Sequence, residues 1–244
     1  QKHHVNVFVR ERQRYRLSRH GLSLFRDLEQ IDQLMLGLQR RITEYDAHLQ
    51  GALTITSTEN LFSSYLQTPI FNFAKLYPGI DLELLISNQI VALPQLEADV
   101  AIRPMPAIPE NYFGFALFTL SFYFYAPTEM AKQCEYKTLP EWPYWIGYAG
   151  ALANARVGER LAQAMNKPPV IRLNSFDGVA AAANAGIGVA LLPSFIGDQQ
   201  PNLLRLQQDA MFSTEVFVVA PNELLDSRRV TTVMRYLSDW FTTG

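Results

Sequence analysis

Apolar residues recur between positions 21 and 50 in alternating steps of four and three residues. The residues at this spacing are Leu24, Leu28, Ile31, Met35, Leu38, Ile42, Tyr45 and Leu49. Such a narrow and regular stripe is typical of a coiled coil, in which it packs against a partner helix. We therefore predict a long linker helix over residues 21–50 that dimerises through the stripe from Leu28 to Leu49. A helix that packs on its own domain is the alternative.

After residue 50 the pattern changes to short apolar runs that alternate with amphipathic stretches. The first part predicts strands at 52–57, 80–86 and 99–103, with helices at about 61–76 and 91–96 between them. Alternating strands and helices are typical of a parallel, doubly wound sheet, so the predicted fold class is α/β.

The segment 104–109 contains three prolines in six residues, which continue neither a helix nor a central strand. It predicts a crossing into a second α/β lobe. In that part we expect strands at 113–125, 170–173, 188–192 and 215–220 and helices at about 153–165, 175–185 and 224–241. The predicted division is a basic segment at 1–20, the linker helix at 21–50, lobe I at 51–111 and 216–244, and lobe II at 112–215. Two crossovers between two lobes predict a cleft between them.

The charge of the first segment differs from that of the rest. Residues 1–20 carry a net charge of +5 in a chain of net charge −2, which leaves −7 for the remainder. Four arginines alternate with other residues there, at Arg10, Arg12, Arg14 and Arg16. Residues two apart share a face of an extended strand, so a row of guanidinium groups is predicted to contact a nucleic-acid backbone. A solvated charged tail is the alternative.

Histidine, a residue type that commonly carries catalysis or binds metals, is missing after Gly51. All four histidines precede it, and Cys134 is the only cysteine, so no intramolecular disulfide can form. A histidine general base is thus lacking there, as are HExxH and CxxC motifs. We expect no enzyme and neither a cofactor nor a metal. No secretory signal is recognisable, which predicts a cytoplasmic location.

Polar residues follow several predicted strands at their carboxyl ends. Ligands of doubly wound sheets bind beyond these ends, which makes the residues candidates for the cleft. The candidates are Ser57, Thr58, Asn60, Ser87, Asn88, Arg103, Asn174, Ser175 and Phe176. Residues 57–60 and 174–176 also begin predicted helices, whose free amide groups favour an anion. Plain helix capping explains any single one of these residues equally well.

Several segments together resemble the LysR-type transcriptional regulators. The wing of that family is similar to VFVR at 7–10 and YRLSRHG at 15–21, and the opening of its effector domain is similar to GALTI at 51–55. Further similar segments are FAKLYPGI at 73–80, LEADVAIR at 96–103 and AGIGVALLP at 185–193. Their order and spacing are more specific than any one of them.

The resemblance implies a two-lobed effector domain built like the periplasmic binding proteins, which follows a linker helix and a winged helix-turn-helix. Most of the helix-turn-helix is expected to precede residue 1. The resemblance further implies a small-molecule effector in the cleft, contact with DNA in the full-length protein, no membrane contact, and self-association into dimers and tetramers. A solute-binding protein of the same two-lobed fold is the alternative.

The family's effector contacts fall on several of the candidates named above. These are Thr58, Asn60, Ser87, Asn88, Arg103 and residues 174–176, and Tyr148 is a further candidate for closing the pocket. We expect Arg103 to pair a carboxylate of the effector, because a guanidinium holds that group with two hydrogen bonds. A structural ion pair near the hinge is the alternative for Arg103.

Overall fold

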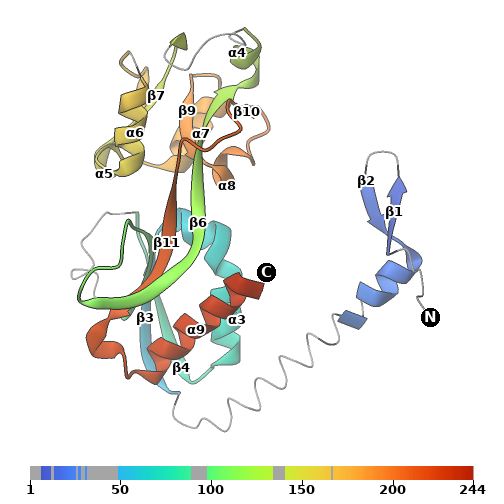
Figure 1. Ribbon diagram of the computed structural model, residues 1–244, viewed down its shortest axis with the longest axis vertical. Coiled ribbons are helices and arrows are strands. Elements are labelled where there is room, and N and C mark those ends of the chain that lie inside the picture. The colour runs from blue at the N-terminus through green and yellow to red at the C-terminus, as the bar shows by residue number, and fades with distance from the viewer. Residues whose placement is uncertain are drawn as a thin grey trace.

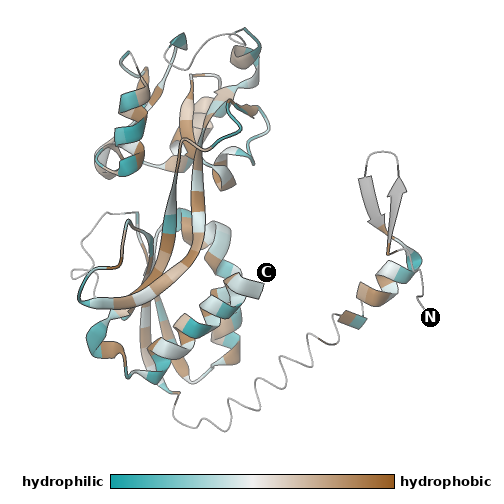
Figure 2. Ribbon diagram, viewed as in Figure 1, coloured by the Kyte–Doolittle hydropathy of each residue, from teal (hydrophilic) through white to brown (hydrophobic). Residues whose placement is uncertain are grey.

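The computed structural model describes residues 7–11, 14–25, 27–28, 31, 49–88, 98–133, 141–165 and 167–243. From residue 49 onward the chain forms two lobes that are connected by two long strands, β6 (Tyr112–Pro127) and β11 (Phe212–Pro221) (Figure 1). We call the lobe that holds the C-terminal helix lobe I and the other one lobe II. Figure 2 shows that the connecting strands are largely apolar along their length.

The N-terminal residues form a hairpin of β1 (Phe8–Glu11) and β2 (Arg14–Leu17). In its antiparallel register Arg10 is opposite Tyr15, and Arg16 is opposite Val9. Opposite residues share a face and neighbours along a strand alternate, so position 10 lies on one face and positions 14 and 16 on the other. The prediction of one row of four arginines is therefore wrong, and Arg12 lies outside the described residues.

Helical residues follow the hairpin at 19–25, 27–28 and 31. Ser18 caps this helix, since its Oγ accepts a hydrogen bond from the Gly21 amide at 2.9 Å. Leu28 and Ile31 of the predicted stripe are exposed, as a partner helix requires, whereas Met35, Leu38, Ile42 and Tyr45 lie outside the described residues. Leu49 is not helical and is buried in the core. Its predicted place in a helix interface is wrong.

Among the described residues, one sheet of seven strands runs through both lobes. In lobe I, β3 (Gly51–Ser57) pairs in parallel with β4 (Ile80–Ile86) and β5 (Val100–Pro104). Strand β11 pairs antiparallel with β5 and β6, and β6 pairs antiparallel in lobe II with β9 (Ala190–Pro193) and β10 (Leu203–Arg205). The parallel strands of lobe I confirm the predicted alternation, but the sheet as a whole is mixed.

Helices pack on the sheet of lobe I. The first begins as α2 (Glu59–Leu61), continues as the π-helical turn η1 (Phe62–Leu66) and ends as α3 (Gln67–Leu76). The last is α9 (Arg228–Thr243), which follows the short 3-10 helix η4 (Asn222–Leu224). Phe73 of α3 and Tyr236 of α9 lie with ring centroids 5.4 Å apart. Both helices were predicted, whereas the helix predicted at 91–96 lies outside the described residues.

Lobe II contains several short elements around β6. They are α4 (Thr128–Gln133), β7 (Ile146–Tyr148), α5 (Gly150–Ala153), α6 (Arg156–Ala164), β8 (Ile171–Leu173), α7 (Phe176–Asn184) and α8 (Ser194–Gly197). Strands β7 and β8 pair in parallel. The predicted helix at 153–165 is divided into α5 and α6. Among the described helices, none combines length with an apolar stretch sufficient to span a bilayer.

The chain crosses from lobe I to lobe II later than the proline-rich segment 104–109 had predicted. The first part of β6, residues 112–118, pairs with residues 216–221 of β11, and residues 216–219 of β11 also pair with β5 of lobe I. The proline-rich segment 104–109 therefore connects β5 to β6 within lobe I. Both lobes share one hydrophobic core cluster, so the connecting strands are a continuous part of the core.

Candidate functional site

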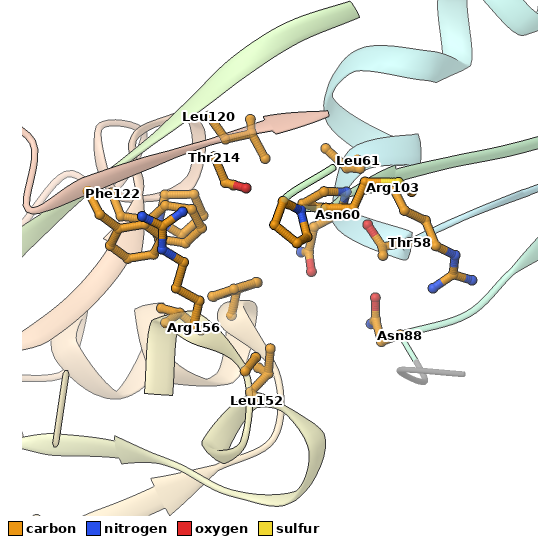
Figure 3. A pocket seen from close by; sticks show the side chains of 18 of the residues that line it. Thr58, Asn60, Leu61, Asn88, Arg103, Leu120, Phe122, Leu152, Arg156 and Thr214 are labelled. Carbon is orange, nitrogen blue, oxygen red and sulfur yellow. The ribbon is translucent and has the colours of Figure 1, made fainter. Parts of the chain in front are cut away.

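A cavity of about 630 Å³ lies between the two lobes (Figure 3). Its volume falls within the roughly 300–1,000 Å³ that is typical of small-molecule sites. Lobe I contributes the ends of β3, β4 and β5 and the proline-rich segment, and lobe II contributes the start of α6, the start of α7 and the beginning of α8. The connecting strands contribute Leu120 and Phe122 of β6 and Phe212 and Thr214 of β11. The predicted cleft is thus present where strand ends of both lobes meet.

Lobe I presents hydroxyl and amide groups to the cavity. Thr58, Asn60 and Asn88 line it, as predicted. The Asn88 side chain also holds the start of α2, because its Oδ1 accepts a hydrogen bond from the Glu59 amide at 3.0 Å and its Nδ2 donates to Glu59 Oε2. Thr58 follows β3 in an extended conformation immediately before α2. The edge of the cavity in lobe I is therefore polar and fixed by its own hydrogen bonds.

Two predicted candidates in lobe I do not line the cavity. Ser57 is buried, and its hydroxyl donates to the Ile102 carbonyl at 3.1 Å, which joins β3 to β5. Ser87 continues β4, and its amide donates to the Ser57 carbonyl at 3.0 Å. Both serines were selected because they end strands, but their hydrogen bonds stabilise the sheet.

Arg103 lines the cavity, yet its guanidinium is held by lobe I. The side chain is only 8% exposed, and Nη2 donates to Thr56 Oγ1 at 3.1 Å. Figure 3 shows the guanidinium on the side of Thr58 and Asn88 that faces away from Phe122 of lobe II. Burial lowers the pKa of Arg103 from its usual value. The burial and the hydrogen bond to Thr56 indicate that Arg103 stabilises lobe I, and the structural ion pair stays a prediction.

The wall of the cavity in lobe II is aromatic. Phe122 of β6 and Phe212 of β11 stack with ring centroids 4.5 Å apart and an interplanar angle of 9°. Phe176, which was predicted, lies 6.0 Å from Phe122 and lines the cavity together with Asn174 and Ser175. Stacked rings of this kind provide a flat apolar surface for a ligand.

Tyr148 acts behind this wall and does not line the cavity. Its ring meets that of Phe176 nearly perpendicularly at 5.7 Å, and its hydroxyl donates to the Leu191 carbonyl. Complete burial raises the pKa of the phenol well above its usual value. The predicted role of closing the pocket is wrong, because Tyr148 instead holds Phe176 in position.

One hydrogen bond joins the lobes across the edge of the cavity. The Asn60 Nδ2 of α2 donates to Asp177 Oδ2 in the first turn of α7 at 2.8 Å. Ser175 caps the same helix, since its Oγ accepts from the Gly178 amide at 3.1 Å. The start of α7 therefore faces lobe I with a carboxylate that Asn60 already engages.

Arg156 is one of the cavity residues that the sequence did not predict. It begins α6, its guanidinium carbon lies 5.2 Å from the centroid of the Phe212 ring, and its side chain is exposed. Figure 3 shows Arg156 and Phe122 together, across the cavity from Thr58 and Asn60. The break between α5 and α6 was not predicted, so nothing in the sequence indicated that Arg156 begins a helix.

Comparison with known proteins identified one family. The family model described as LysR substrate binding domain matches residues 46–242. No curated protein matches the chain.

The solved structures that are similar share the fold at low sequence identity. The CrgA regulatory domain of Neisseria meningitidis, a LysR-type transcriptional regulator, has a TM-score of 0.63 and 18% identity over 79% of this chain and 99% of that chain. A structure of CrgA from the same organism has a TM-score of 0.64 and 20% identity over 97% of this chain and 84% of that chain. The virulence activator AphB of Vibrio cholerae has a TM-score of 0.59 and 15% identity over 96% of this chain and 83% of that chain.

Proposed function

Because this chain belongs to the LysR substrate binding domain family, we propose that it is the sensing part of a transcriptional regulator and that the cavity binds its small-molecule effector. The observation that carries this proposal is a cavity of about 630 Å³ that both lobes line. A ligand in this place contacts the two lobes at once and so stabilises one arrangement of them. Ligand binding then shifts the population of lobe arrangements, which is the basis of an allosteric response.

The output of such a sensor requires the N-terminal segment. We infer that the helix after the hairpin dimerises, because Leu28 and Ile31 are exposed and follow the heptad spacing. We also infer that arginines of the hairpin contact the phosphates of DNA in the full-length protein, in the cytoplasm.

The effector proposal is tested by filling the cavity. Thr214 lines it from β11, whereas its neighbour Ser213 is exposed and does not. Thr214→Trp occupies the cavity with an indole, and Ser213→Trp adds the same group outside it. A library of metabolites is screened by thermal unfolding of the wild-type chain and both variants.

A cavity-bound effector at about 100 times its Kd stabilises the chain by about 2.7 kcal/mol, which raises the Tm of a domain of this size by about 5–10 °C. We expect this shift in the wild type and in Ser213→Trp but not in Thr214→Trp. Compounds that shift all three proteins equally bind elsewhere. If every stabilising compound behaves in that way, the cavity is not the effector site.

A further inference from the structure

We propose that the effector is a largely apolar monoanion, whose charged group pairs with Arg156 and whose apolar body lies on the phenylalanines of lobe II. This inference rests on the proposed function, since it identifies the chemical class that the same cavity selects. The sequence predicted Arg103 of lobe I as the ionic contact, whereas this proposal assigns the contact to Arg156 of lobe II.

The charges of the lining support an anion. Arg103 and Arg156 are among the described residues that line the cavity, but no aspartate or glutamate is. The nearby carboxylate of Asp177 is engaged by Asn60. A ligand carboxylate, sulfonate or phosphate therefore meets a positive surface, whereas a cation is repelled.

Arg156 is the arginine that is available to a ligand. Arg103 is buried and donates to Thr56, whereas Arg156 is exposed and its Nη1 makes only a long contact of 3.4 Å to the Ser213 carbonyl. Among the described residues, no carboxylate lies within ion-pair distance of Arg156. A guanidinium in this position can turn toward an anion without giving up an internal ion pair.

The rest of the lining selects an apolar body. The stacked rings of Phe122 and Phe212 form the aromatic wall of the cavity. The proline-rich segment, which includes Met105, lines the cavity from lobe I. Arg156 sits 5.2 Å from the Phe212 ring, at the border of the aromatic surface. A molecule whose acidic group is attached to an apolar or aromatic body can therefore contact the rings and the guanidinium together.

Two dyes with the same aromatic body test this pairing. 1-Anilinonaphthalene-8-sulfonate carries a sulfonate, and N-phenyl-1-naphthylamine is its neutral counterpart. Binding to the full chain is measured by fluorescence titration, and only the signal that Thr214→Trp removes is assigned to the cavity. The two charge variants are Arg156→Gln and Arg160→Gln. Arg160 lies one turn further along α6, does not line the cavity and hydrogen-bonds to Gln163, so it controls for a general loss of positive charge.

We expect Arg156→Gln to weaken cavity binding of the sulfonate dye by about tenfold, while the neutral dye stays within twofold. Arg160→Gln should leave both dyes within twofold. The proposal is overturned if Arg156→Gln leaves the sulfonate dye unchanged, weakens both dyes equally, or has no larger effect than Arg160→Gln. The absence of any cavity signal for either dye also overturns it.

Failure of this inference is distinguishable from failure of the proposed function. A neutral or cationic metabolite that stabilises the wild type but not Thr214→Trp in the thermal screen keeps the cavity as the effector site. The dye result would then exclude only the apolar anion. If no metabolite depends on the cavity, the proposed function fails whatever the dyes show.

Discussion

Asn60 is a residue of lobe I whose side chain forms a hydrogen bond to lobe II, and its replacement is expected to open the lobes. Its amide donates to the Asp177 carboxylate at 2.8 Å, and it is 8% exposed. Asn60→Ala removes the donor. Asn60→Asp keeps the shape of the side chain but places a second carboxylate opposite Asp177, so that attraction becomes repulsion.

The size of the effect follows from this hydrogen bond. A hydrogen bond to a charged group contributes about 1.5–3 kcal/mol, and the exposure of Asp177 lowers this to about 1–2 kcal/mol because water screens the carboxylate. The ratio of closed to open lobes should therefore fall by about 5- to 30-fold in Asn60→Ala. Asn60→Asp should produce a larger fall.

Small-angle X-ray scattering of the ligand-free chain measures the separation of the lobes through the radius of gyration. We expect this radius to increase in the order wild type, Asn60→Ala, Asn60→Asp. Asn222→Ala is the matched control, because Asn222 Nδ2 donates to the Glu110 carbonyl, a hydrogen bond within lobe I. Equal radii for wild type and Asn60→Asp, or an increase in Asn222→Ala as large as that in Asn60→Ala, would refute the reasoning.

Further predictions concern the stability of the fold and are measured by urea unfolding. Gly114→Ala should lower the free energy of unfolding by about 1–3 kcal/mol, because a Cβ there would lie 2.1 Å from the Val218 carbonyl oxygen. Gly186 has a φ of 89° but no atom within 4 Å of such a Cβ, so Gly186→Ala should lower it by only about 1 kcal/mol through backbone strain. Burial raises the pKa of Tyr148 in the folded chain above its ordinary 10.0. As the pH rises past about 10, the phenol therefore ionises in the unfolded chain before it does in the folded chain, and the free energy of unfolding falls. This fall should be shallower in Tyr148→Phe, which has no phenol to ionise. Arg103→Met should lower the free energy of unfolding and weaken binding of the sulfonate dye less than Arg156→Gln does, and a loss of dye binding larger than that of Arg156→Gln would restore Arg103 as the ionic contact.

Most elements of the effector domain could be predicted because each has a local signal. The strands of lobe I and helix α7 appear within a few residues of their predicted positions, since apolar runs and the turn at 77–79 mark their ends. The mixed sheet could not be predicted in this way. Whether β6 and β11 are parallel or antiparallel to their neighbours depends on pairing between residues about a hundred positions apart, and no local pattern encodes it.

The candidate site was predicted less completely than the fold, for a geometric reason. The rule that ligands bind beyond strand ends selects positions along the chain but not the direction of each side chain. It therefore identified Thr58 and Asn88 correctly, and it also selected Ser57, whose hydroxyl bonds within the sheet. Phe212 and Arg156 come together from β11 and α6, and their proximity is a property of the folded chain only.

The junction with the N-terminal segment limits how a signal from the cavity leaves this domain. Leu49 is buried in the core, and the Gln50 carbonyl accepts a hydrogen bond from Arg229 Nη1 of α9 at 3.0 Å. Gly51 follows with a φ of 105°, a backbone conformation that favours glycine. The hydrogen bond between Gln50 and α9 lies within lobe I, which means that the entering chain is attached to lobe I. A ligand that moves lobe II therefore does not displace the N-terminal segment of its own chain directly. The displacement has to pass through a surface that includes lobe II, and in a self-associating regulator that surface is a contact with a second copy of the chain.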